Sequence, residues 1–398
     1  MSGRVDPGTG KGSGVGAIYI YQDLIARAAD NKPARVGLIG AGKFGSMFLS
    51  QVPTSKGLHV SVIADINVDA AKHRCRAIGW TEERIRSTRF IEDAFALIEE
   101  AEIDVVVEAT GNPVIGVAHA NAAIEAGRHI VMVNVEADVL TGALLAKKAK
   151  SAGVVYSMAY GDQPALTCEL VEWARSCGFD VTAAGKGTKY LPSYHASTPD
   201  TVWEHYGLTK EQAAEAGMNS QMFNSFLDGT KSALEMAAVA NATFLAPAPD
   251  GLSFPPAGAD DLAQVLRPEN EGGCLHHKGQ VEVVSSLERD GRPVYRDLRW
   301  GVYVVLEASN DYTAACFQEY GMNTDESGRY SAMYKPFHLI GLEVNISILS
   351  AAILKKPTGS TQGFVGDVVA TAKRDLKAGE VLDGEGGYTV YGKLMPAE

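Results

Sequence analysis

The sequence contains no apolar run long enough to cross a bilayer and no Cys-x-x-Cys pair. A membrane-spanning helix needs ~20 consecutive apolar residues, and no segment of this 398-residue chain has such a run. The five cysteines are scattered and odd in number, which predicts free thiols in a reducing compartment, not a disulfide framework or a zinc site. The first 16 residues are rich in glycine and serine and lack the apolar segment of a signal peptide. We therefore expect a disordered leader over residues 1–17 and a cytoplasmic location.

Basic residues are also scarce. The chain has 36 Lys and Arg against 48 Asp and Glu, a net charge of -12. A surface this acidic disfavours nucleic acid and anionic membranes as partners, because both are bound through clustered Lys and Arg. A small-molecule partner, even an anionic one, is compatible with it, since a local pocket can be basic within an acidic protein. The hydrophobic content of 46% is that of a globular protein, and the length predicts two or three domains.

Expected strands and helices alternate through the first part of the chain. Short apolar runs typical of buried parallel strands are each followed by a segment with helical periodicity. The expected strands cover residues 35–39, 60–65, 103–108, 129–133 and 154–157. This spacing predicts an α/β fold, a doubly wound parallel sheet with helices on both faces, over residues 18–160.

A glycine-rich turn follows the first expected strand. Residues 40–45 fit the pattern G-x-G-x-x-G and open a helix, which is the context that a Rossmann dinucleotide site requires. Gly40 allows the tight turn, Gly42 lets backbone amides approach a pyrophosphate, and Gly45 lets helix and strand pack closely. The start of the helix also presents unpaired N–H groups to the phosphates. The candidate cofactor contacts in this turn are Gly40, Gly42, Lys43, Phe44 and Gly45.

Further candidate contacts follow the next expected strands. Asp65 lies about 20 residues beyond the glycines, where an acid bonds the adenosine ribose hydroxyls. Because a carboxylate repels a 2′-phosphate, Asp65 predicts NAD, although Lys72 and Arg74 leave NADP possible. Polar groups after the third and fourth strands lie in the crevice where ligands bind such sheets. These candidates are Thr110, Gly111, Asn134 and Glu136; the alternative is that they are ordinary residues of βα turns.

After Gly161 the alternation ends, and two further domains are expected. An α+β domain for catalysis and dimerisation is assigned to residues 161–356, and a small β module to residues 357–398. The expected elements of the middle domain are a helix over 164–177, a strand over 180–184, a glycine-rich loop over 185–190, a long helix over 220–243, an antiparallel pair over 281–287 and 295–306, and a helix over 336–356. The tail has three short β-forming runs, at 368–370, 379–382 and 388–391.

Two polar residues early in the middle domain are candidate catalytic groups. Asp162 lies at the carboxyl end of the fifth expected strand, although it is equally suited to cap the helix that follows. Lys186 lies in the expected glycine-rich loop. Glycines let a backbone come close to a ligand, and an ammonium group suits a phosphate or a developing oxyanion; the alternative is a solvent-facing lysine.

Three charges on the expected long helix form the other candidate group. Asp228, Lys231 and Glu235 are spaced i, i+3 and i+7, which places them on one helix face. The rest of the helix is apolar nearly all round, which implies burial, and buried charges must be paired or face a cleft. One interpretation is an internal ion-pair ladder.

The other interpretation is an active-site face on which Lys231 or Lys186 exchanges a proton, because burial can lower the pKa of a lysine toward neutrality. Glu136, Asp162, Asp228 and Glu235 then orient the substrate or a divalent cation. The metal itself is left open.

These segments resemble the homoserine-dehydrogenase-like oxidoreductases with a C-terminal SAF domain. The resemblance is carried by residues 40–45, 109–111, 134–138, 185–187, 226–231 and 240–243, and by residues 370–380, which are similar to the SAF signature. The best-defined relatives are the type II, or DXR-like, 1-deoxy-D-xylulose 5-phosphate reductoisomerases, which reduce a rearranged keto-sugar phosphate with NADPH. The resemblance implies an NAD(P)-dependent dehydrogenase or reductase of the EC 1.1.1 type, which is an oxidoisomerase if the carbon skeleton rearranges.

Two features depart from those relatives. Asp65 suits NAD instead of NADPH, and residues 189–195 contain no clear phosphate-binding cluster beyond lysine. We therefore expect hydride transfer to or from another small polyhydroxy carbonyl compound, sugar-like or sugar-acid-like. The alternatives are the reductoisomerase itself, a homoserine dehydrogenase, and a non-catalytic nucleotide sensor. The apolar segments around Leu234 and Ile346 are consistent with a homodimer or a higher homo-oligomer.

Overall fold

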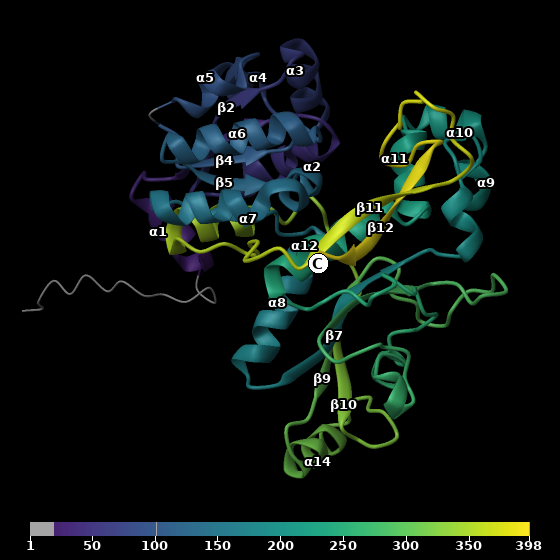
Figure 1. Cartoon of the computed structure of the whole chain (residues 1–398). Coiled ribbons are helices and arrows are strands. Elements are labelled where there is room, and N and C mark those ends of the chain that lie inside the picture. The colour runs from purple at the N-terminus through teal and green to yellow at the C-terminus, as the bar shows by residue number, and fades with distance from the viewer. Residues whose placement is uncertain (1–19, 101, 398) are drawn as a thin grey trace, which may run out of the picture.

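Six parallel strands form the centre of the N-terminal part of the molecule (Figure 1). The computed structural model describes residues 20–100 and 102–397, so the expected leader lies outside the described residues. The strand order is β3-β2-β1-β4-β5-β6, which confirms the predicted doubly wound sheet. Its strands are β1 (Ala34–Ile39), β2 (Leu58–Ala64), β3 (Arg89–Ile91), β4 (Val105–Glu108), β5 (His129–Met132) and β6 (Tyr156–Met158).

Helices cover both faces of this sheet because its strands are Val- and Ile-rich and buried on both sides. Asparagine caps fix the starts of three of these helices at the carboxyl edge of the sheet: Asn67 at α3, Asn112 at α6 and Asn134 at α7. The helices are α1 (Ile20–Ala29), α2 (Lys43–Gln51), α3 (Val68–Ala77), α4 (Glu82–Ser87), α5 (Ala94–Ile98), α6 (Pro113–Glu125) and α7 (Val135–Ala152). The carboxyl edge therefore carries a series of rigid helix starts.

A late segment of the chain returns to this first core. The helix expected over residues 336–356 begins only at α15 (Asn345–Leu349) and continues as one π-helical stretch, Ser350–Leu354. Its apolar side chains are buried in the same core as strands β1, β2 and β4. The residues before Asn345 form turns and irregular structure, because Gly341 takes a positive φ of 75° there.

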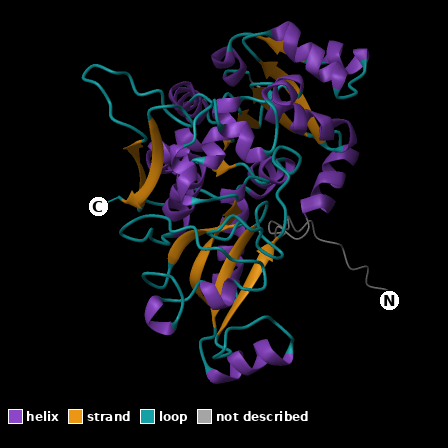
Figure 2. Ribbon diagram, turned by 90° about the vertical axis from the view of Figure 1, so that its right-hand side faces the viewer, coloured by secondary structure: helices purple, strands orange, loops and turns teal. Residues whose placement is uncertain are grey.

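The middle of the chain forms a four-stranded mixed sheet with the order β10-β9-β7-β8 (Figure 2). Its strands are β7 (Asp180–Thr188), β8 (Gln280–Ser285), β9 (Val302–Glu307) and β10 (Tyr330–Lys335). The sequence predicted that residues 281–287 and 295–306 pair with each other, and this prediction is wrong. Strand β8 runs parallel to β7, and β9 pairs with the other edge of β7. Strand β7 comes between the two expected partners because its own buried residues complete the sheet.

Strand β7 is longer than predicted and includes the glycines that suggested a loop. A Cβ atom at Gly185 would lie 1.8 Å from the carbonyl oxygen of Glu282, and one at Gly187 would lie 2.0 Å from that of Leu298. The glycines are therefore required by close backbone packing and not by an approaching ligand. Lys186 lies between them on the strand, and its side chain is buried.

The predicted long helix is two helices, α11 (Ser220–Leu227) and α12 (Thr230–Thr243). The break falls at Asp228 and Gly229, where Gly229 has a φ of 93° that interrupts the helix. Helix α12 is buried almost throughout and packs on α8, on α7 and on the C-terminal strands. It thus lies at the junction of the three parts of the molecule.

The C-terminal segment forms an antiparallel pair, β11 (Gly366–Ala372) and β12 (Val390–Pro396), drawn in yellow in Figure 1. The tail is a small β module as predicted, but residues 379–382 form turns and irregular structure between the two strands. Both strands pack on α12. The resemblance of this segment to a SAF domain stays a prediction.

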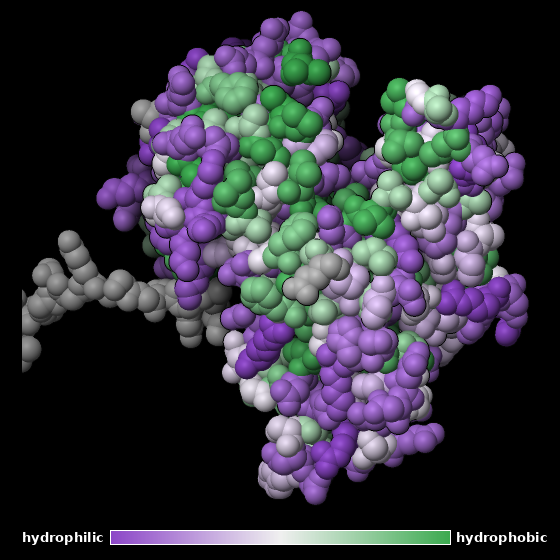
Figure 3. All heavy atoms as spheres, viewed as in Figure 1, coloured by the Kyte–Doolittle hydropathy of each residue, from purple (hydrophilic) through white to green (hydrophobic). Residues whose placement is uncertain are grey.

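The remaining helices surround the mixed sheet: α8 (Gln163–Ser176), α9 (Val202–Tyr206), α10 (Lys210–Glu215), α13 (Leu262–Val265) and α14 (Asp311–Glu319). In the described part of the chain, no helix combines the length and apolarity that crossing a membrane requires. The space-filling view shows a notch between the Rossmann part and the part formed by α9, α10, α11 and the C-terminal loop, with apolar residues on both walls (Figure 3).

Candidate active site

The glycine-rich turn has the geometry of a dinucleotide site. Gly40 takes a φ of 92°, and a Cβ at Gly45 would approach the Gly40 carbonyl oxygen to 2.4 Å, so both glycines are required by the turn itself. Gly42 is the N-cap residue of α2, and no side chain caps the first amides of this helix. The space beside Gly42 is open, because a Cβ placed on it would meet no atom within 4 Å. The first amides of α2 are thus available to a diphosphate.

Asp65 is directed back to this turn. Its carboxylate accepts a hydrogen bond from the backbone N–H of Ala41 at 2.9 Å and another from Asn67. Arg74 lies beside it, with Nη1 3.3 Å from the Ala41 carbonyl oxygen and 3.8 Å from Asp65 Oδ2. By contrast, the ammonium group of Lys72 lies over the Phe90 ring. Arg74 is therefore the cation placed beside the acid that is expected to bind the ribose.

The polar groups after β4 and β5 hold the two loops together. Thr110 Oγ1 donates to the buried Glu108 carboxylate at 2.5 Å. Asn134 donates from Nδ2 to the carbonyl oxygen of Asn112 at 2.8 Å while its side-chain oxygen caps α7. Gly111 has a positive φ of 71°. The structure therefore gives Thr110 and Asn134 a positioning role at this edge, and the sequence pattern did not reveal Glu108.

Lys231 and Glu136 meet at the junction of the domains. Glu136 lies in the first turn of α7, at the carboxyl edge of the Rossmann sheet, and Lys231 lies in the first turn of α12. Their side chains are 2.5 Å apart, from Nζ to Oε1, and both are mostly buried. The pair joins the nucleotide-binding sheet to the middle domain, so a ligand at this edge meets both groups.

A second buried pair lies one helical turn farther along α12. Glu235 accepts a hydrogen bond from Lys186 of β7, and both side chains are at most 5% exposed. Asp162 caps α8 by accepting from the Gln163 N–H at 2.9 Å, so the predicted capping role is present. Burial, followed by the charge of Glu235, raises the pKa of Asp162 to about 6.

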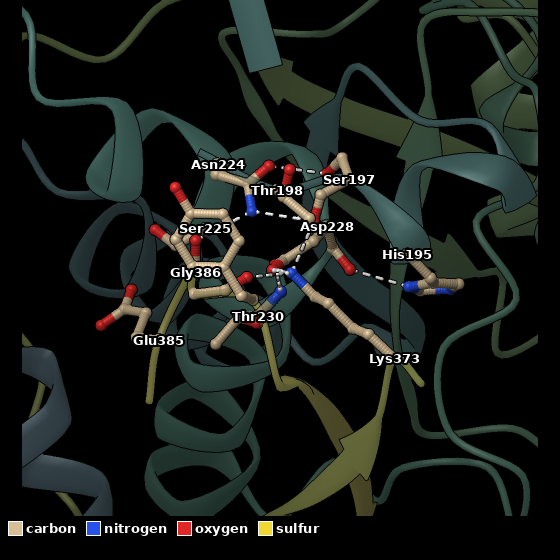
Figure 4. A network of polar contacts seen from close by, with 12 residues as sticks. His195, Ser197, Thr198, Asn224, Ser225, Asp228, Thr230, Lys373, Glu385 and Gly386 are labelled. Atoms are coloured by element: carbon tan, nitrogen blue, oxygen red, sulfur yellow. Dashed lines mark hydrogen bonds and ion pairs between the residues drawn. The ribbon is translucent and has the colours of Figure 1, made fainter. Parts of the chain in front are cut away.

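Asp228 does not share the face of Lys231 and Glu235, as the sequence predicted, because it lies at the break between α11 and α12. Its carboxylate accepts from Lys373 at 2.8 Å and from the Thr230 N–H at 2.9 Å (Figure 4). Both members of the Asp228–Lys373 pair are essentially fully buried. The role of Asp228 in this structure is to fix the C-terminal segment to the middle domain.

The pKa of Lys231 is raised instead of lowered, which corrects the expectation of a neutral lysine. Burial acts to lower its pKa, but the charges of the four nearby carboxylates act to raise it, and their effect is larger. These carboxylates belong to Glu136, Glu385, Glu235 and Asp162. Lys231 is therefore an ammonium group over the whole physiological range and acts chemically as a hydrogen-bond donor and a positive charge.

Glu385 is the member of this group that the sequence analysis missed. It lies in the loop between β11 and β12, within the run Gly384-Glu385-Gly386. The only local signal was an acid flanked by glycines, which also occurs in ordinary turns. Among the described residues, no group of three or more side chains is arranged to hold a metal ion.

Comparison with known proteins identifies the two larger domains. The family model described as the homoserine dehydrogenase NAD-binding domain matches residues 40–158, and the model described as the oxidoreductase DRL catalytic domain matches residues 161–344. The chain has the architecture of an NAD(P)-dependent oxidoreductase. No curated protein matches its sequence.

Solved structures similar to this oxidoreductase include three enzymes. A homoserine dehydrogenase from Thiobacillus denitrificans is 15% identical, with 81% of this chain and 74% of that chain covered and a TM-score of 0.48. A biliverdin reductase from Synechocystis is 23% identical, with 46% of this chain and 55% of that chain covered and a TM-score of 0.31. A myo-inositol dehydrogenase from Corynebacterium glutamicum is 14% identical, with 43% of this chain and 48% of that chain covered and a TM-score of 0.32. The chain spans about half the length of the last two, and 44% of a Bacillus subtilis protein.

Proposed function

We propose that this protein transfers a hydride between NAD(P) and a small polyhydroxy carbonyl compound held between the Rossmann sheet and α12. The observation that carries the proposal is the Lys231–Glu136 pair, which places a buried ammonium group at the carboxyl edge of the sheet that bears the glycine-rich turn. Ligands of open α/β sheets bind at that edge. A charge fixed there acts on an oxygen of a bound substrate.

The residues of the turn fit the cofactor. Gly42 leaves the α2 amides uncovered for the diphosphate, and Asp65, which accepts from the Ala41 N–H, would bind the adenosine ribose. When bound, the nicotinamide ring supplies or accepts the hydride. We propose NAD as the preferred form, with NADP tolerated through Arg74.

In the proposed reaction, Lys231 donates a hydrogen bond to the substrate oxygen and stabilises the negative charge that develops there. Glu136 holds the ammonium group in place, and the Lys186–Glu235 pair forms the wall behind it. Asp162 is ionised at neutral pH because its pKa of about 6 lies below 7, so it accepts hydrogen bonds from substrate hydroxyls. Excluding water from this junction strengthens each of these interactions.

The decisive experiment has two stages. Calorimetric titration of the protein with NAD and with NADP is expected to show saturable binding. Incubation with a panel of sugars, sugar acids, polyols and hydroxy acids is then expected to produce NADH. Saturable binding with no turnover on the panel would favour the nucleotide sensor, and NADPH oxidation with deoxyxylulose phosphate would favour the reductoisomerase. Absence of binding by either nucleotide would contradict the proposal.

Replacing Arg74 with alanine is expected to weaken NADP binding by ~10-fold and leave NAD binding nearly unchanged, because one hydrogen bond to a charged group contributes about 1.5–3 kcal/mol. The matched control is Lys72→Ala on the same helix, which removes a cation directed to Phe90. Dissociation constants of both nucleotides, measured calorimetrically for both variants, test the prediction. An equal loss of NADP affinity in the two variants would show that Arg74 has no special position.

Replacing Asp65 with asparagine is expected to have the opposite effect. The variant retains a hydrogen-bonding side chain beside Ala41 but loses the charge that repels a 2′-phosphate. The ratio of the NADP to the NAD dissociation constant should therefore fall, by ~10-fold for each 1.4 kcal/mol of repulsion removed. The same calorimetric titrations measure this ratio, and an unchanged ratio would place the ribose away from Asp65.

A further inference from the structure

The loop between β11 and β12 is fastened to the middle domain at its base. Lys373 donates to the Asp228 carboxylate at 2.8 Å and to the carbonyl oxygens of Ser197 and Gly387, each at 2.7 Å (Figure 4). This ammonium group therefore joins the two ends of the loop to the break between α11 and α12. The base of the loop is fixed by three hydrogen bonds to one buried cation.

The same loop is also fastened to α11, close to its base. Asn224 donates from Nδ2 to the Gly386 carbonyl oxygen at 2.8 Å, and Gln221 donates from Nε2 to that of Glu385 at 2.9 Å. Gly386 has a φ of 67°, and a Cβ there would lie 2.0 Å from the Gln221 carbonyl oxygen. Only glycine fits this close approach, so the position of the neighbouring Glu385 is set by backbone contacts.

The side chain of Glu385 points away from the Lys373–Asp228 pair in Figure 4 and belongs to the site at the domain junction. Ser225 of α11 and Glu136 of α7 are among the neighbouring groups that act on the pKa of its carboxyl group. The charges that face it are Lys231 and Glu235 of α12, together with Glu136. Three elements from different parts of the chain therefore surround this carboxyl group.

The other three carboxylates of the site each have a strong partner. Glu136 is paired with Lys231, Glu235 with Lys186, and Asp162 accepts from the N–H of Gln163. In the part of the chain that the structure describes, Glu385 has no lysine or arginine nitrogen within ion-pair distance of its carboxylate. Asp162 has no such nitrogen either, but its carboxylate caps α8. Among the described residues, Glu385 is therefore the carboxyl group of the site that has neither an ion pair nor a helix cap.

We propose that Glu385, delivered by the C-terminal module, is the catalytic acid–base residue of the proposed hydride transfer. The inference rests on that proposed function. In the oxidising direction, the substrate carbon gives up its hydrogen as a hydride to the nicotinamide, and the hydroxyl proton passes to the Glu385 carboxylate as the C=O bond forms. In the reducing direction, the Glu385 carboxyl group returns that proton to the oxygen. Lys231 stays an ammonium group bonded to the oxygen throughout.

The electrostatics agree with this geometry. The site holds four carboxyl groups and the two lysines Lys186 and Lys231, so one carboxyl group is protonated readily. Burial raises the pKa of Glu385 to about 7, and the nearby Glu136 adds to the rise while Lys231 opposes it. For Glu136, burial is outweighed by the charge of Lys231, and its pKa falls. Glu385 therefore ionises as the pH rises through about 7.

The test compares Glu385→Gln with Asp375→Asn, a control that removes an exposed carboxylate of the same module. In the wild type, kcat/KM for oxidation should rise with pH to a plateau with an inflection near 7. Glu385→Gln should lose ~10²–10⁴-fold of that rate together with the inflection, while its dissociation constant for NAD is unchanged. Asp375→Asn should retain both. A Glu385→Gln variant that keeps the rate and the inflection would overturn the inference and leave the proposed function intact.

A second measurement does not depend on turnover. Potentiometric titration of the folded wild type and of Glu385→Gln should differ by about one proton released between pH 6 and 8, because the glutamine cannot ionise. Identical titration curves would overturn the inference. If the proton difference is present but no nucleotide binds, the proposed function fails, and the acid–base assignment fails with it.

Discussion

Replacing Lys231 with methionine is expected to reduce kcat/KM by ~10²–10⁴-fold, because the variant keeps the length of the side chain and removes the charge that stabilises the developing oxyanion. Nucleotide binding should persist, since Lys231 lies on α12 and the glycine-rich turn lies on the Rossmann sheet. Steady-state kinetics with the substrate that the panel reveals, and calorimetry with NAD, measure the two effects separately.

The control for this prediction is Lys210→Met, which removes an exposed lysine whose nearest acid is 3.7 Å away. Ion pairs as exposed as this one contribute about 0–1 kcal/mol, so the control should match the wild type in rate and in nucleotide affinity. A Lys231→Met variant within a few fold of the wild-type kcat/KM would remove the ammonium group from the mechanism and leave the Lys231–Glu136 pair with a structural role.

Replacing Lys373 with methionine is expected to destabilise the protein by about 3–5 kcal/mol, the usual cost of leaving one member of a buried ion pair without its partner. The side chains of Lys373 and Asp228 are 2% and 0% exposed, so water does not replace the lost ammonium group. The carbonyl oxygens of Ser197 and Gly387 lose a donor in the same step. Thermal and urea unfolding of the wild type and the variant measure the difference.

The double variant Lys373→Met with Asp228→Asn should be less destabilised than the sum of the two single variants, because it no longer buries an unpaired charge. The exposed Lys377→Met, in the same loop, serves as a control and should unfold like the wild type. If Lys373→Met unfolds at the wild-type temperature, the C-terminal loop is not held by this pair. The position of Glu385 would then depend on the contacts of Gln221 and Asn224 with the loop alone.

The conformation of residues 40–45 could be predicted because most of it is local. The positive φ of Gly40 and the close approach of Gly45 to the Gly40 carbonyl oxygen arise within the turn itself, although a Cβ at Gly40 would also meet the carbonyl oxygen of Ala109. The same reason explains why the alternation of strands and helices predicted the order of the Rossmann elements. Where a structural role depends on neighbours in the chain, the pattern of residue types contains it.

The second half of strand β7, residues 185–188, could not be predicted because the roles of its glycines are not local. Gly185 and Gly187 avoid collisions with the backbone at Glu282 and Leu298, about a hundred residues away. In the sequence they have the appearance of a flexible loop. Lys186 was singled out as a candidate, but its strand position and its pairing with Glu235 depend on contacts that no nearby residue indicates.

Helix α12 was misplaced for a related reason. The apolar periodicity continues through Asp228 and Gly229, so the pattern favours one long helix, but Gly229 adopts a φ of 93° and breaks it. Asp228 then faces Lys373 instead of the site that Lys231 and Glu235 share. A single backbone dihedral thus separates a residue that fixes the C-terminal loop from two residues of the candidate site.

By itself, the sequence determined the doubly wound sheet and the glycine-rich turn that follows its first strand, because periodicity and turn chemistry act over a few residues. It also singled out several of the charged residues that the structure pairs. Only the tertiary structure decided which charges meet: Lys231 with Glu136, Lys186 with Glu235, and Lys373 with Asp228. It also brought Glu385 into the group. Lys186 and Glu235 are 49 positions apart in the chain, and Lys373 and Asp228 are 145 positions apart. Such pairs form because α12 is buried between domains, where each charge needs a partner from a distant part of the chain.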